Sequence, residues 1–489
     1  MIALPLGLFL AAVALLYRWL RAPGWSRGDR LRWALAWGPA LAFGLPSCAL
    51  FAARWCGLDG ALPWSLATGG ALAAGGLALR RRRSAALVPS AVDAPGAAGE
   101  FSPPTGARGA GRALALRGTS AALLAITFVL LLGTFRTWQR AQPAGMWDAV
   151  AIWNSSARFL ARAEADRLPA LFSAQTEGHP GYPLFLSAAV AAQWAVAEDE
   201  SSAVPLGMSF CLALGLAAAL HLAVRLCGAP LFAGPSVLLV FSTPIVWKWA
   251  FAQVADLPLA YLALAGALPL VVVLQDQARS APPAVVSGFI LGLLPWTKDE
   301  GALVAAALLG LFVGLAWLHG LLRPDRRRQI LPFLLGTLPG VGALVLFKLT
   351  WAPAVPARAS FLRGAAAWAQ LVDFDRWHLV AAATLRHLDP RTGDALWGFA
   401  WPLLGLGLLF WGGGLRWRAA PGAVLLAGAA AMIFMSYVFA LVLSPYDLAW
   451  HVASALDRLL LHVLPLLAAA VFGLAGADTS NAQRAPPAR

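Results

Sequence analysis

Long apolar runs recur along this chain and constrain its fold more than any other feature. Hydrophobic residues make up 60% of the 489 residues, and charged residues make up only 12%. The runs predict an all-α polytopic bundle of about 12 or 13 transmembrane helices, because a span needs roughly 20 predominantly apolar residues. The apolar runs, not all of which are counted as full spans, lie at about 2–20, 33–55, 61–79, 118–135, 181–197, 204–226, 230–247, 257–275, 284–296, 301–319, 330–351, 396–411, 421–443 and 459–476.

Basic segments divide the chain and set its expected orientation. Arg-rich segments lie at 21–32 and 80–83, and an excess of basic residues marks loops that stay on the cytoplasmic side. Residues between the third and fourth runs are rich in Arg, Ala, Gly and Pro without periodicity, which is typical of a flexible linker. The predicted divisions are a three-span N-terminal extension at 1–83, a cytoplasmic linker at 84–117, a main transmembrane domain at 118–476 and a polar tail at 477–489.

Charge and cysteine content exclude several classes of protein. The net charge is +14, and in a membrane protein such an excess reflects basic loops. Because no soluble basic domain is present, we exclude nucleic acid as a partner and expect membrane lipid instead. The four cysteines have no CxxC or Cys/His spacing, so neither a zinc site nor a disulfide framework is indicated.

Assigning successive apolar runs to alternate sides of the membrane gives conflicting sides for Asp256 and Lys298. This conflict indicates an irregular segment between them and Asp148. The span before the first long polar loop leads outward, which places Asp148 on the extracytoplasmic side. Threading forward from there puts Asp256 and Lys298 inside, whereas threading backward from the basic loop 323–329 puts them outside. One run between 181 and 250 is therefore expected to be short, re-entrant or wrongly counted as a span. The stretch 230–247, with three prolines, is the candidate, because irregular backbone is tolerated at membrane depth where protein covers it.

Ionisable residues interrupt the apolar pattern in four clusters. Such groups are costly near a bilayer and tend to be functional or paired. The structural alternatives are an interfacial aromatic belt, loop punctuation, a solvated loop and snorkelling at a span end. The clusters contain Trp147, Asp148, Trp153, Asn154 and Arg158; Glu177, His179 and Tyr182; Asp256 with Lys298, Asp299 and Glu300; and Trp450, His451, Ser454, Asp457 and Arg458.

The first two clusters contain groups that could move a proton. A carboxylate that faces water beside the membrane can act as a general base, and we predict this role for Asp148. Glu177 and His179 could converge with Asp148 on a divalent metal or on a substrate hydroxyl.

The other clusters contain cations that could bind a phosphate. Lys298 is a compact, flexible point charge, and it interrupts an otherwise nearly continuous apolar stretch. Arg458 begins the last apolar run, where its guanidinium would suit a lipid phosphate. Asp457 and Arg458 are adjacent, so on a helix they cannot point the same way.

The clusters, in this order, resemble the GT-C superfamily of membrane glycosyltransferases. The resemblance is closest to the bacterial branch that includes the dolichyl-phosphate-mannose–protein mannosyltransferase-like and RgtA/B/C/D-like enzymes. It covers roughly residues 118–476, which would form the GT-C-like domain. The segments that carry it are "WDAVAIWNSSARFL", "HPGYPLFL", "ADLPLAY", "GLLPWTKDEGAL" and "LAWHVASALDRLLLHVLP". One position departs: Gly181 stands where this branch has an aspartate, which removes a possible metal ligand.

The resemblance implies a multi-span enzyme of a bacterial inner membrane, with its active site facing the periplasm. Its donor would be a polyprenyl-phosphate sugar, and its acceptor a hydroxyl of an envelope glycan, lipid or protein. Asp148 would be the catalytic base, while Lys298 and Arg458 would face the donor phosphate. No cofactor is certain, although a divalent metal could involve Asp148, Glu177, His179 and Asp256. The expected substrate-binding residues are Glu177, His179, Tyr182, Asp256, Asp299, Glu300, Trp450, His451 and Asp457.

Two other functions are compatible with the same sequence. A transporter or flippase of a lipid-linked glycan would have charges spread through the bilayer midplane and a symmetric fold. A non-catalytic protein of envelope assembly could use a GT-C-like fold without activity. The charges in this sequence gather at outer span ends, which favours chemistry at the membrane surface.

Overall fold

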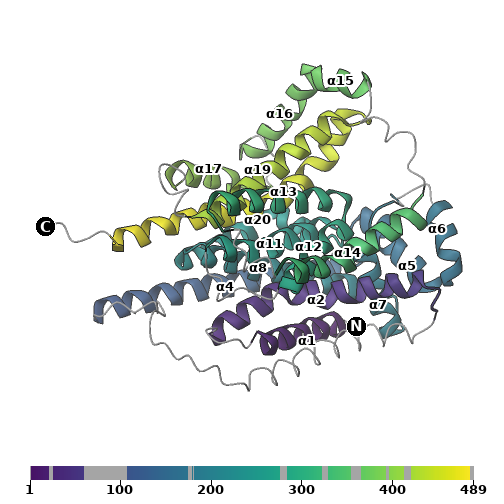
Figure 1. Cartoon of the computed structure of the whole chain (residues 1–489), viewed down its shortest axis with the longest axis horizontal. Helices are drawn as coiled ribbons and strands as arrows, with labels where there is room; N and C mark the ends of the chain where they lie inside the picture. Colours follow the sequence, from purple (N-terminus) through teal and green to yellow (C-terminus); the bar gives the residue numbers. More distant parts are fainter. Residues whose placement is uncertain are drawn as a thin grey trace.

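The computed structural model describes most of the chain, and its regular structure is helical. The residues described are 2–20, 26–59, 107–174, 179, 181–275, 284–321, 329–353, 365–391, 396–411 and 420–484. Within these segments helices lie side by side and no strand occurs, which confirms the all-α fold (Figure 1). The predicted run 61–79 lies outside the described residues.

Among the described residues, eight helices are long and apolar enough to cross a membrane, so this is a multi-pass membrane protein. They are α2 (Arg27–Trp55), α4 (Ala107–Ala141), α8 (Ala203–Leu226), α11 (Asp256–Leu274), α13 (Asp299–Leu318), α14 (Ile330–Thr350), α19 (Pro421–Val442) and α20 (Leu448–Arg484). α4 and α20 extend beyond their apolar runs, so 107–117 of the predicted linker and 477–484 of the predicted tail are helical.

The remaining described runs form shorter or broken helices. The shorter apolar helices are α1 (Ala3–Trp19), α7 (Phe185–Ala197), α12 (Ala284–Thr297) and α17 (Ala400–Trp411), and the broken pair consists of η3 with α9 (Ala233–Ser242) and then α10 (Pro244–Ala250). The helices that connect them are η1 (Ala149–Trp153), α5 (Asn154–Arg162), η2 (Ala165–Arg167), α6 (Leu168–Ala174), η3 (Pro230–Phe232), α15 (Ala365–Val372) and α16 (Phe374–Leu388).

Helix α11 forms the centre of the bundle. Its apolar window is 94% buried by protein, whereas that of α14 is 22% buried, as expected for a helix that is hydrophobic on every side. The Tyr261 hydroxyl of α11 donates to the Ala36 carbonyl at 2.8 Å and accepts from the Ala40 N–H at 3.1 Å. It thereby inserts into the backbone hydrogen-bond ladder of α2 and fixes α11 against that helix.

Helices α12 and α14 pack with their backbones in close contact. Each contains two glycines four residues apart, Gly288 and Gly292 in α12 and Gly336 and Gly340 in α14. A Cβ on Gly288 would lie 1.9 Å from the Phe333 carbonyl oxygen, and one on Gly340 would lie 2.2 Å from that of Gly292. Small residues at this spacing allow membrane helices to approach closely, and the packing fixes the end of α12.

The stretch 230–247 is broken, as predicted from its prolines. The two halves, Pro230–Ser242 and Pro244–Ala250, are bent by 73°. Thr243 between them is extended, with φ of −80° and ψ of 117°, which is the conformation favoured before proline.

α7 is a short apolar helix, and contacts at both of its ends reach the segment that contains α5. Near its start the Ser187 hydroxyl donates to the Trp153 carbonyl at 2.8 Å. Beyond its end, Glu200 pairs with Arg162 of α5 at 2.6 Å. Both ends of α7 therefore meet the same polar segment, and α5, α6 and α7 lie together at one end of the molecule (Figure 1).

The contacts of the broken pair with α20 favour a broken span over a re-entrant loop. Ala229, just before η3, lies against Gly476 of α20. Asp256, just after α10, contacts Arg458 of the same helix. These two positions on α20 are about 27 Å apart along the helix axis, at 1.5 Å per residue. Arg458 contacts both Asp148 and Asp256, so these two residues lie at the same end of the bundle.

Candidate functional site

A buried carboxylate, Asp256, is the centre of the polar residues in this bundle. Asp256 is the first residue of α11 and is 0% exposed. Lys298 Nζ lies 3.0 Å from its Oδ1, while Arg458 Nη2 and Nε lie 2.9 and 3.0 Å from its Oδ2. His462 Nε2 lies 3.3 Å from Oδ1. A buried charge needs such partners, and here two cations and an imidazole supply them.

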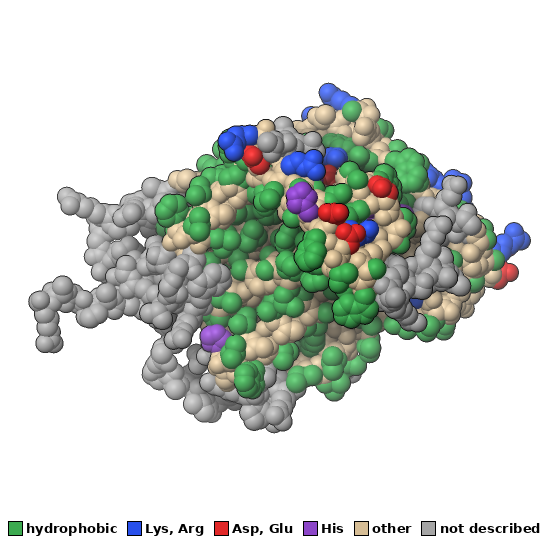
Figure 2. Space-filling model, turned by 90° about the horizontal axis from the view of Figure 1, so that it is seen from above, with side chains coloured by type: hydrophobic (Ala, Val, Ile, Leu, Met, Phe, Trp, Pro, Cys, Tyr) green, Lys and Arg blue, Asp and Glu red, His purple; other side chains and the backbone are tan. Residues whose placement is uncertain are grey.

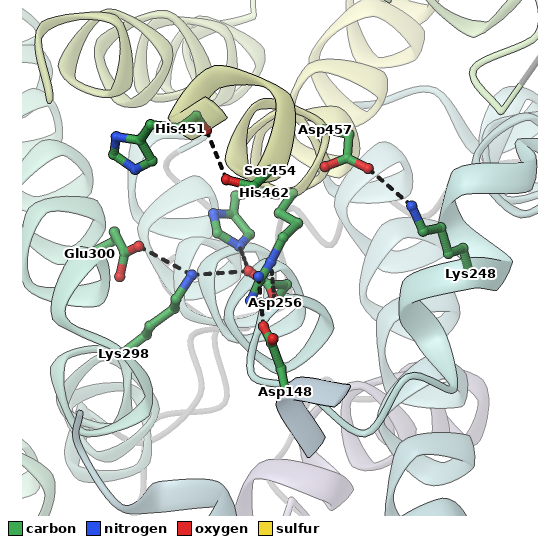
Figure 3. Close-up of polar contacts among 10 residues, drawn as sticks. Asp148, Lys248, Asp256, Lys298, Glu300, His451, Ser454, Asp457 and His462 are labelled. Atoms are coloured by element: carbon green, nitrogen blue, oxygen red, sulfur yellow. Dashed lines mark hydrogen bonds and ion pairs between the residues drawn. The ribbon is translucent and has the colours of Figure 1, made fainter. Parts of the chain in front are cut away.

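The contacts continue outward from Asp256 (Figure 3). Arg458 Nη1 lies 2.7 Å from Asp148 Oδ2, and Lys298 Nζ lies 3.1 Å from Glu300 Oε1. His462 Nδ1 lies 2.9 Å from the hydroxyl of a buried tyrosine in α19. We call this set the Asp256 network, which consists of Asp148, Asp256, Lys298, Glu300, Tyr437, Arg458 and His462.

Helix ends bring the network together. Asp256 begins α11, and Lys298 is an extended residue between α12 and α13, with φ of −161°. Arg458 and His462 are four residues apart on α20 and therefore lie on one face of it. Figure 2 shows a largely hydrophobic face of the molecule, on which the charged side chains gather in the upper and right-hand part.

The loop before Asp148 is fixed to the segment between α10 and α11. The Met146 N–H donates to the Ala252 carbonyl at 3.2 Å. The Gln253 side chain donates to the Pro143 carbonyl at 2.7 Å. Gln253 has a φ of 60°, a strained conformation for a residue other than glycine that persists only where its surroundings enforce it. The backbone at Asp148 is therefore held in place from the neighbouring segment.

Gly145 is required for this arrangement, and its replacement tests it. Gly145 has a φ of 80°, and a Cβ there would lie 2.6 Å from the Ala252 carbonyl oxygen. We expect Gly145→Ala to lower the free energy of unfolding by about 1–3 kcal/mol, measured by equilibrium unfolding in mixed micelles. Gly133→Ala is the matched control, because Gly133 lies in α4 with nothing within 4 Å of its Cβ position. Equal effects of the two changes would contradict this role for Gly145.

His179 and Tyr182, the described members of the second predicted cluster, form an aromatic stack beside the network. His179 stacks on Tyr182 with ring centroids 4.7 Å apart, and Tyr182 stacks on Trp153 at 5.7 Å. Desolvation by the surrounding protein lowers the pKa of His179, outweighing the nearby Asp148, and burial raises the pKa of Tyr182. His179 is therefore neutral and Tyr182 protonated at neutral pH. Glu177 lies outside the described residues.

Two acidic residues that we predicted to bind substrate form ion pairs with lysines outside the Asp256 network. Asp299 pairs with Lys348 at 2.7 Å, and Asp457 pairs with Lys248 at 3.3 Å (Figure 3). Asp457 and Arg458 thus point to different partners, as their adjacency predicted.

The last two predicted substrate-binding residues lie near the start of α20. Trp450 is 61% exposed. His451 Nδ1 lies 2.7 Å from the Ser444 hydroxyl. Within the described part of the chain, the hydrogen bonds of these two residues go to partners other than the Asp256 network.

Sequence reasoning missed three residues that take part in these contacts. His462 could have been found, because it lies one helical turn after Arg458 and so shares its face. Tyr437 lies within a continuous apolar run, where nothing in the pattern marks it. Lys248 is one of the chain's few lysines, but no signal pointed to Asp457 as its partner.

A divalent metal fits these residues poorly. Among the described residues, no group of three or more His, Cys, Asp or Glu side chains is arranged to hold one. Both oxygens of Asp256 already face basic side chains, and Arg458 lies between Asp256 and Asp148.

The arrangement can bind an anion and accept a proton at adjacent positions. Asp148 is 22% exposed and Arg458 is 18% exposed, so both can be reached from outside the bundle. Lys298 behind them is 5% exposed and adds positive charge. No family model, curated protein or solved structure matches this chain.

Proposed function

We propose that this protein is an integral membrane glycosyltransferase that moves a monosaccharide from a polyprenyl-phosphate donor to an acceptor hydroxyl. The acceptor would be an extracytoplasmic glycan, lipid or protein. One observation carries the proposal: a partly exposed carboxylate, Asp148, shares the guanidinium of Arg458 with the buried Asp256 at one end of an apolar bundle. Surface-accessible charge beside lipid-facing helices suits a substrate with a polar head and a prenyl chain.

The proposed reaction assigns a role to each side of this arrangement. The acceptor oxygen attacks the anomeric carbon of the sugar while the bond from that carbon to the phosphate oxygen breaks. Asp148 takes the hydroxyl proton as general base. The departing prenyl phosphate keeps the bonding electrons, and Arg458, supported by the charge of Lys298, stabilises its developing negative charge.

The order of segments supports a periplasmic site in a bacterial plasma membrane. α13 begins at the network with Asp299 and ends at Leu318, just before the Arg-rich segment 323–329. Basic segments stay on the cytoplasmic side of bacterial membranes, so the network would lie on the opposite side. The resemblance of this region to GT-C glycosyltransferases implies the same orientation.

A transporter of a lipid-linked glycan is the second candidate, and the broken pair α9–α10 favours it. Transporters commonly place broken helices at their binding sites, in pairs related by internal repeats. Among the described residues there is a single bent pair. The network also lies at helix ends rather than at mid-depth, which makes chemistry at the surface the better proposal.

Purified protein in liposomes with a radiolabelled polyprenyl-phosphate sugar separates these functions. We expect release of prenyl phosphate together with transfer of the sugar to acceptor or water. Movement of intact donor across the bilayer without its consumption would support a transporter instead. Neither consumption nor movement, across a panel of sugars and acceptors, would favour a non-catalytic protein.

A further inference from the structure

The two carboxylates that share Arg458 are held very differently. Asp256 is fully buried, and each of its oxygens contacts basic nitrogens. Asp148 is partly exposed, and its contact with Arg458 Nη1 is its one ion pair among the described residues. A carboxylate can accept about four hydrogen bonds, so Asp148 is the member of the pair that can exchange.

Arg458 is held in place independently of Asp148. Its Nε and Nη2 both contact Asp256, and its guanidinium lies over the ring of Trp249, 5.1 Å from the centroid. These contacts fix the plane of the guanidinium. If Asp148 turned away, the Nη1 edge would remain in place and face the partly exposed side of the network.

We infer that the donor phosphate and Asp148 compete for Arg458 Nη1, so that binding of the donor releases Asp148 to act as the base. This inference rests on the proposed function. A phosphate placed beside the Asp148–Arg458 pair would meet a like charge, and one anion therefore has to leave. When Asp148 leaves, the oxygen that Arg458 occupied becomes free to accept the proton of the acceptor hydroxyl. The reaction is then ordered, with the donor binding before the acceptor is activated.

The exchange requires little movement of the protein. The backbone before Asp148 is fixed by Met146 and Gln253, so the carboxylate moves by rotation of its own side chain. Asp148 directly precedes the π-helical turn η1 and makes no capping hydrogen bond to it. Nothing in the local backbone therefore opposes its rotation.

Binding of farnesyl phosphate in detergent tests the competition directly. We expect Asp148→Asn to bind it about three- to tenfold more tightly than wild type by calorimetry, because the competing charge is gone. Asp148→Ala should show the same increase. Arg458→Gln should lose most of the binding. Glu200→Gln is the matched control, because it also removes a partly exposed carboxylate paired with arginine, and its affinity should equal that of wild type.

The outcomes separate this inference from the proposed function. Equal or weaker binding by both Asp148 variants, with folding confirmed by thermal unfolding, would overturn the competition. If the wild-type protein still transferred sugar, the proposed function would stand without the competition. Absence of farnesyl phosphate binding by wild type and by every variant would overturn both the competition and the phosphate role of Arg458.

Discussion

Replacing Asp256 by asparagine is expected to lower the free energy of unfolding by about 3–5 kcal/mol, the cost of breaking a buried ion pair from one side. Asp256 is fully buried, and Lys298 is 5% exposed. The neutral amide would leave Lys298 without its closest counter-charge and Arg458 with Asp148 alone. Equilibrium unfolding in mixed micelles measures the change.

Asp457→Asn is the control for this prediction. Asp457 lies next to Arg458 on α20, but it pairs with Lys248, which is 32% exposed. We expect a loss of less than about 1 kcal/mol, as for other ion pairs that water reaches. A comparable loss in both variants would show that Asp256 is not the structural centre of the site.

Asp148→Asn is expected to reduce sugar transfer about 10²- to 10⁴-fold, the usual contribution of a positioned general base. Its folding should change little, because Asp148 is partly exposed and Arg458 keeps its contacts with Asp256. The measurement is the initial rate of sugar transfer in liposomes, with thermal unfolding of the same preparation as the check on folding. Glu200→Gln should retain the wild-type rate. Transfer retained by Asp148→Asn would remove Asp148 from the role of base.

The helices could be predicted from the sequence, but the number of crossings could not. Runs of apolar residues form helices throughout the described segments, because hydrophobic length and composition determine that outcome. The same composition does not distinguish a helix that crosses the bundle from one that packs along one end of it. α7 and the broken pair α9–α10 are both apolar, and contacts with α5 and α20 decide between them.

The candidate site was predictable as a set of positions and not as a set of contacts. Charges that interrupt apolar runs identified Asp148, Asp256, Lys298 and Arg458. Their pairing was hidden, because Lys298 is 42 and Arg458 is 202 residues from Asp256 in sequence. The sequence presented the two cations as free to meet a phosphate, whereas both already contact Asp256. Because the cations are already paired, a phosphate that binds Arg458 has to displace a carboxylate.

A crystal structure with farnesyl phosphate bound would test the competition for Arg458 most directly. We expect a phosphate within hydrogen-bonding distance of Arg458 Nη1, with Asp148 turned away from it and the Asp256–Lys298 contact intact. A phosphate bound elsewhere, with Asp148 still paired to Arg458, would contradict the competition.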